Sequence, residues 1–205
     1  MTAGRSIYLG PWRIDVTTRD GAAPLPAGVS VAALARAVAA ALDVAGAPPP
    51  ASIGLILSDD TELAELNERH LGEVGPTDVL SFPLLPPAAY PAHAGGPGRG
   101  GSGADPASTA TLAFTLPPSR RPHLGDIVVS VERAMAQAHE GRGGQTGDVA
   151  WSAADELRLL VTHGALHVCG WDHADPAEEA AMRALERRLL DRARIPQAPT
   201  APGRS

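Results

Sequence analysis

The stretch that decides how this chain folds and what it binds reads His163-Gly164-Ala165-Leu166-His167-Val168-Cys169-Gly170-Trp171-Asp172-His173. The first two histidines are four residues apart on an expected helix, so both imidazoles lie on one face, about one turn apart. Gly170 can adopt backbone angles that other residues avoid, which lets the chain turn sharply and bring His173 back. The segment therefore predicts a metal site whose ligands are His163, His167 and His173.

Three imidazole nitrogens leave a fourth position for water, which is the arrangement of a catalytic rather than a structural zinc site. Zinc lowers the pKa of such a water toward ~7 and makes hydroxide available at neutral pH. Scattered helix histidines are the alternative, but three of the seven histidines fall within these 11 residues. We expect one Zn²⁺ per chain, although nickel and iron accept the same ligands.

The histidine spacing equals that of the long zinc-protease signature, with one difference. Those proteases need a glutamate directly after the first histidine as general base, and this chain has Gly164 there. The three metal ligands are therefore present, but the general base that peptide-bond hydrolysis requires is absent from this position. Hydrolysis of another bond, such as a phosphodiester, is the better hypothesis.

Charge and composition narrow the class of protein. The 205-residue chain has a net charge of −6 and no lysine, whereas a domain that grips duplex backbone usually shows a basic stripe. Its single cysteine, Cys169, allows no internal disulfide, which suits a reducing compartment. Residues 1–13 lack a signal-peptide core, and no stretch has the ~18 unbroken apolar residues of a membrane span. We expect a cytoplasmic protein with no membrane partner.

Strands and helices alternate along the chain around one expected core, which favours an α/β or α+β class. Capping residues mark the helix starts, glycines mark several ends, and short apolar runs mark the strands. The expected helices follow Ser30, Asp59, Ser130, Ser152 and Asp175. The expected strands are 7–16 (interrupted by Gly10 and Pro11), 52–57, 79–84 and 125–130.

Two segments differ in composition from the rest. Residues 86–122 are rich in Pro, Gly, Ala and Ser and cannot bury enough apolar surface to offset the entropy of ordering. We predict a disordered insertion there, in which 111–116 could pair as an edge strand. We also predict one domain over 1–195 and a disordered tail over 196–205.

Three blocks together resemble the YbeY family of bacterial endoribonucleases, also called rRNA maturation factors. They are Leu66-Asn67 with Gly75-Pro76-Thr77-Asp78-Val79-Leu80-Ser81-Phe82-Pro83, then Leu124-Gly125-Asp126-Ile127-Val128-Val129-Ser130, and the histidine segment. The resemblance implies an α+β fold, with a small mixed β-sheet flanked by helices, and a zinc on the three histidines. It implies a single-strand-specific endoribonuclease of 16S rRNA 3′-end maturation and ribosome quality control, with the small ribosomal subunit or its proteins as partner.

The chain departs from the family pattern at His70 and Leu71, where the family usually has an aromatic residue followed by an arginine that binds substrate phosphate. Arg69 is the candidate replacement, although on a helix it points about 200° away from position 71. Asp78 and Ser81, near the start of an expected strand, are further candidates for substrate binding, and ordinary turn chemistry is their alternative. The missing arginine and the acidic net charge favour a second hypothesis, a ribosome-assembly factor whose metal is mainly structural.

Asp172 is the candidate catalytic residue, as a general base or as an acceptor for a ligand imidazole. Its alternative is a turn residue that caps local backbone N–H groups. Trp171 can stack on a base or pack in the core, and Cys169 is expected to pack. A group of four arginines is expected to form a solvated helix face, paired with Glu178, Glu179 and Glu186, or a basic rim that contacts rRNA; its members are Arg183, Arg187, Arg188 and Arg192.

Overall fold

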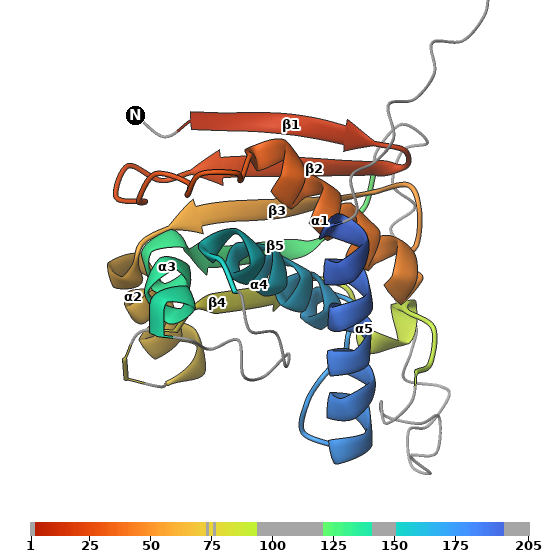
Figure 1. The fold of residues 1–205 in the computed structure, drawn as a ribbon. Helices are drawn as coiled ribbons and strands as arrows, with labels where there is room; N and C mark the ends of the chain where they lie inside the picture. The colour runs from red at the N-terminus through yellow and green to blue at the C-terminus, as the bar shows by residue number, and fades with distance from the viewer. Residues whose placement is uncertain (1–2, 73, 76, 94–120, 141–150, 195–205) are drawn as a thin grey trace, which may run out of the picture.

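The fold is a single mixed β-sheet with helices on both faces (Figure 1). The computed structural model describes residues 3–72, 74–75, 77–93, 121–140 and 151–194. Its strands are β1 (Ala3–Leu9), β2 (Trp12–Thr18), β3 (Ala51–Ser58), β4 (Val79–Pro83) and β5 (His123–Ser130). Its helices are α1 (Val31–Ala45), α2 (Asp60–Leu71), the short 3-10 helix η1 (Pro87–Ala89), α3 (Val131–Glu140), α4 (Ala153–Val168) and α5 (Pro176–Arg194).

The strand order is β1-β2-β3-β5-β4, and the pairings explain why the sheet is mixed. The two outer pairs, β1 with β2 and β4 with β5, are antiparallel, whereas β3 lies parallel to β2 and β5. The expected α+β class with a small mixed sheet is therefore confirmed. One strand prediction was wrong: 7–16 is not a single interrupted strand but part of a hairpin, because Gly10 takes the left-handed φ of 57° at its turn.

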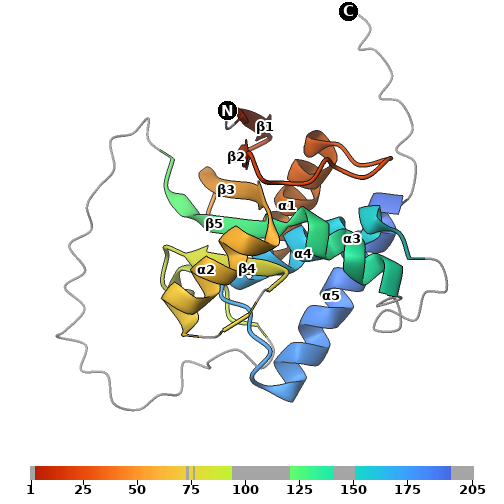
Figure 2. The same ribbon diagram turned by 90° about the vertical axis from the view of Figure 1, so that its left-hand side faces the viewer.

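The helices are divided unequally between the two faces of the sheet. Figure 2 shows α1, α3, α4 and α5 on one side and α2 on the other. The main core lies on the side covered by α1, α3, α4 and α5. There α4 turns Leu157, Leu160, Val161 and Ala165 inward, as its apolar spacing predicted. Under α2 a small second cluster forms around Leu63, Leu80 and Val128. Strand β4 is thus an edge strand with α4 against one face and α2 against the other.

The helix starts agree with their predicted caps. Side-chain oxygens of Ser30, Asp59, Ser130 and Asp175 accept backbone N–H groups from the first turn of the helix that follows each. Ser152 and Asp155 form the complete reciprocal capping box at the start of α4. Helix α4, which carries His163 and His167, is therefore capped at its N-terminus by the two residues that the sequence predicted.

Part of the predicted insertion is ordered. Within 86–93, η1 forms and Tyr90 is buried, because this segment packs against the end of α4 at Gly170. Residues 94–120, including the proposed edge strand 111–116, lie outside the described residues. The predicted tail 196–205 lies outside them as well.

Candidate metal centre and cleft

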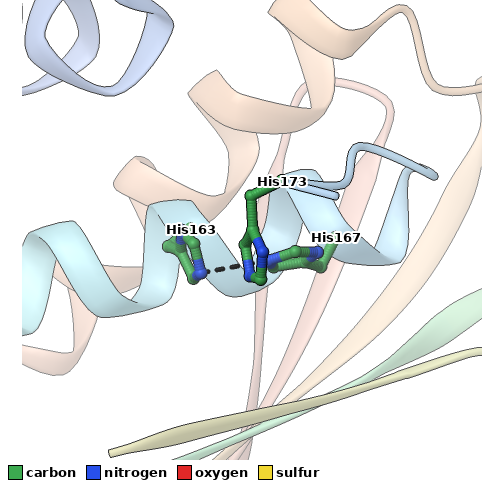
Figure 3. Close-up of side chains that lie close together, drawn as sticks. All are labelled: His163, His167 and His173. Carbon is green, nitrogen blue, oxygen red and sulfur yellow. Dashed lines mark hydrogen bonds between the residues drawn. The ribbon is translucent and has the colours of Figure 1, made fainter. Parts of the chain in front are cut away.

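The three predicted ligands come together at one point (Figure 3). His163 and His167 project from the C-terminal half of α4, and His173 reaches back from the loop before α5. The Nε2 atoms of His163 and His167 are 3.0 Å apart, and one ring nitrogen from each of the three histidines lies within 4.8 Å of the others. A tetrahedral zinc with bonds of about 2.0–2.1 Å separates ligand nitrogens by roughly 3.3 Å. The His163–His167 pair is close to that spacing, and the His173 side chain, the third of the set, is 57% exposed.

The turn that returns His173 begins at Gly170, as predicted. Gly170 has φ of 84°, and its N–H donates to the carbonyl of His167 at 2.9 Å. The N–H of Trp171 donates to the carbonyl of Leu166 at 3.1 Å. These bonds close the end of α4 while the left-handed residue reverses the chain.

A buried carboxylate orients the first histidine. Oε1 of Glu186, on α5, lies 2.7 Å from Nδ1 of His163. Since a carboxylate only accepts, Nδ1 carries the proton and Nε2 presents its lone pair toward His167. A carboxylate behind a ligand imidazole is a recurrent feature of zinc sites, where it fixes the tautomer and raises the basicity of the ligand.

A second buried carboxylate holds the loop that carries His173. Oε1 of Glu178 accepts the backbone N–H of Asp172 at 2.8 Å and lies 2.7 Å from Nε2 of His93. The ring of His93 in turn stacks on Trp171, with centroids 4.0 Å apart. Trp171 is therefore partly buried and packs against the core, as its packing interpretation predicted.

Sequence reasoning missed these two carboxylates. It assigned Glu178 and Glu186 to a solvated ion-paired face, but they are only 3% and 8% exposed. Only Glu179 fits that expectation, in an ion pair with Arg183. For Glu178 the sequence did contain a sign of burial. It shares the i, i+4, i+7, i+11 spacing of one α5 face with the buried Met182, Leu185 and Leu189.

Burial and mutual repulsion keep the central imidazole neutral. Burial above all, with the neighbouring His163 and His173, lowers the pKa of His167 to about 4, against weaker opposing effects of the Trp171 backbone and Asp172. A neutral imidazole is the form that binds a metal, so no proton has to leave His167 at neutral pH. Burial also raises the pKa of the Cys169 thiol to about 12, which agrees with its expected packing role.

The histidines lie in a cleft of about 1070 Å³ between β4, α4 and α5. Asp78 and Ser81, two of the predicted substrate-binding residues, line it, as does Asp172. Arg69, the third, is exposed on α2 and is not among the lining residues, because the residue that α2 turns toward this space is His70. His70 lies edge-on to Phe82, with ring centroids 5.2 Å apart.

The polar residues of the cleft also have structural partners. Oγ of Ser81 donates to the carbonyl of Gly164 at 3.1 Å, and Oδ2 of Asp78 accepts from Gln137 at 3.1 Å. Asp172 caps the backbone N–H of His173 at 2.7 Å, and its carboxylate lies 4.0 Å from Nδ1 of the same residue. Asp172 thus has the turn-capping contact of its alternative interpretation and a position beside a candidate ligand.

Gly164 faces the sheet. A Cβ built on it would lie 2.6 Å from Cγ2 of Ile127 and 3.2 Å from Oγ of Ser81. The position that carries the general base in zinc proteases is therefore used here for close contact between α4 and the sheet. Glutamate cannot occupy it unless the Ile127 side chain or the helix shifts.

Convergent imidazoles in an open cleft on an α+β scaffold define a metal-dependent hydrolase. The family model for "Endoribonuclease YbeY" matches residues 26–194. The chain belongs to this family of endoribonucleases. No helix among the described residues is long and apolar enough to cross a bilayer.

Curated relatives agree with the family model. An endoribonuclease YbeY of Salinispora tropica is 41% identical over 151 residues, which are 73% of this chain and 79% of the relative. Those of Roseiflexus sp. and Thermobifida fusca are 36% and 37% identical, covering 82% and 86% of this chain and 86% and 91% of the relatives. Similarity thus extends over most of each protein.

Proposed function

We propose that this chain is a zinc-dependent, single-strand-specific endoribonuclease that acts in 16S rRNA 3′-end maturation and ribosome quality control. Its partners would be the 16S rRNA precursor and the small ribosomal subunit or its proteins, in the cytoplasm. Family membership supports RNA as the substrate. The observation that carries the proposal is the convergence of three histidine nitrogens within 4.8 Å inside the cleft.

In this proposal His163, His167 and His173 hold the ion, and Glu186 keeps the Nε2 of His163 available to it. When bound, the ion supplies Lewis acidity that lowers the pKa of water and polarises a phosphoryl oxygen. Asp172, an exposed residue that lines the cleft, is the proposed acceptor of the proton that the attacking water loses. Ser81 lies on β4 and Asp78 directly precedes that strand, and both line the wall that an extended RNA strand would meet.

The test compares wild type with His163→Ala on an unstructured RNA, each with and without a chelator. We expect cleavage by wild type alone, its loss with chelator, and its recovery when zinc is restored. His163→Ala should stay inactive after zinc is added, because one of three ligands is missing. Cleavage that survives both the chelator and the substitution would overturn the proposal.

A second candidate function is a ribosome-assembly factor with a mainly structural metal and little nuclease turnover. Leu71, in the place of the usual family arginine, favours it. This candidate predicts binding to the small subunit that His163→Ala weakens by unfolding the loop, with negligible RNA cleavage. Robust zinc-dependent turnover by purified wild type would exclude it.

A further inference from the structure

Among the residues that the structure describes, two arginines line the cleft, and both come from α5. Arg183 and Arg187 line it together with Glu179, Met182 and Glu186. These residues have the i, i+3, i+4, i+7 and i+8 spacing of a single helix face. Arg187 directly follows Glu186, whose carboxylate contacts His163, so its backbone is next to the residue that supports the histidine cluster.

The two arginines differ in what they already bind. Arg183 is engaged by the carboxylate of Glu179, one turn earlier on α5. Within the described part of the chain Arg187 forms no ion pair, and the adjacent carboxylate of Glu186 is directed to His163. Arg187 therefore offers a guanidinium in the cleft that holds the three histidines, and this guanidinium is available to an anion from outside.

We propose that Arg187 binds a backbone phosphate of the RNA strand in the cleft. A guanidinium presents paired N–H donors that match two phosphate oxygens, and it stays charged at every working pH. This inference rests on the proposed function. It assigns the phosphate contact to α5, because the arginine of α2, Arg69, does not line the cleft. Arg183 would contribute to the same strand only when Glu179 releases it.

The chain offers matched controls on the same helix. Arg188 is exposed but does not line the cleft, and Arg192 lines a separate groove between α1, α4 and α5. Replacing any of these arginines by alanine changes the net charge equally. A difference between the variants therefore reports position in the cleft rather than overall charge.

The experiment measures binding of zinc-loaded protein to a fluorescein-labelled single-stranded RNA by anisotropy, at several salt concentrations, with a gel to show that the probe stays intact. We expect Arg187→Ala to weaken binding on the order of tenfold and to flatten the slope of log affinity against log salt by about 0.7. Arg188→Ala and Arg192→Ala should match wild type, and Arg187→Lys should retain part of the affinity. Glu179→Gln, which frees Arg183, should bind more tightly than wild type.

In a parallel cleavage assay, Arg187→Ala should raise KM more than it lowers kcat, because the contact is made to bound substrate. If wild type binds and cleaves while Arg187→Ala behaves like Arg188→Ala, the inference is wrong and the proposed function stands. If wild type neither binds nor cleaves single-stranded RNA, the proposed function fails and the inference fails with it.

Discussion

Oε1 of Glu186 lies 2.7 Å from Nδ1 of His163, and this contact links α5 to α4 at the metal centre. The glutamate side chain is 10% exposed and the histidine side chain 29% exposed. The pair has the geometry by which a carboxylate orients a zinc-binding imidazole. It makes α5 part of the site, although none of the three candidate ligands belongs to that helix.

Glu186→Gln should weaken zinc binding by about 10- to 100-fold, because an amide orients the imidazole without raising its basicity. Competition with a coloured zinc chelator measures the change. Glu179→Gln is the control, since this substitution removes the same charge from the same helix, and Glu179 contacts Arg183 rather than a histidine. Equal zinc affinities in the two variants would show that Glu186 does not support the site.

Glu178→Ala should loosen the loop that carries His173, because the N–H of Asp172 loses its acceptor. A hydrogen bond to a charged group contributes about 1.5–3 kcal/mol. Hydrogen exchange should therefore become faster at Asp172 and His173. Glu178→Gln keeps a carbonyl acceptor and should stay closer to wild type; similar exchange in wild type and Glu178→Ala would contradict this role.

Gly164→Ala should lower the free energy of unfolding by about 1–3 kcal/mol, less the ~1 kcal/mol that alanine gains over glycine in a helix. The reason is the 2.6 Å approach of the new Cβ to Cγ2 of Ile127. Urea unfolding measures the loss. Ile127→Ala removes that methyl group, so the double variant should be more stable than the sum of the two single changes predicts. If the changes in unfolding free energy are strictly additive, the new Cβ does not clash with Ile127.

In chelator-treated protein, His167 should make stability depend on pH. Its folded pKa of about 4 lies below the ordinary histidine pKa of 6.5, so between these values the unfolded chain binds more protons. The contribution of His167 is fully present above the unfolded pKa and is lost as the pH falls toward 4. Urea unfolding at pH 5 and pH 7 should show a larger acid loss for wild type than for His167→Gln, and equal losses would contradict the shift.

Sequence alone was sufficient for the parts of the molecule governed by local chemistry. Caps at Ser30, Asp59 and Ser152 start helices because they satisfy backbone donors within one turn. The i, i+4 spacing of His163 and His167 places both rings on one helix face, and Gly170 makes the turn that returns His173. Each of these depends on residues close in the chain, so each could be predicted from the printed order.

Only the tertiary structure decided which residues from other elements reach the site. Arg69 follows Asn67 closely but is exposed on α2, whereas Arg187 is far along the chain and lines the cleft. Glu178 and Glu186 resembled members of an ordinary charged helix until the packing of α5 on α4 buried them against the histidine loop and His163. The sequence determined the histidine cluster because helix and turn geometry are local; the groups that support and surround it depend on how separate elements pack, which local periodicity does not encode.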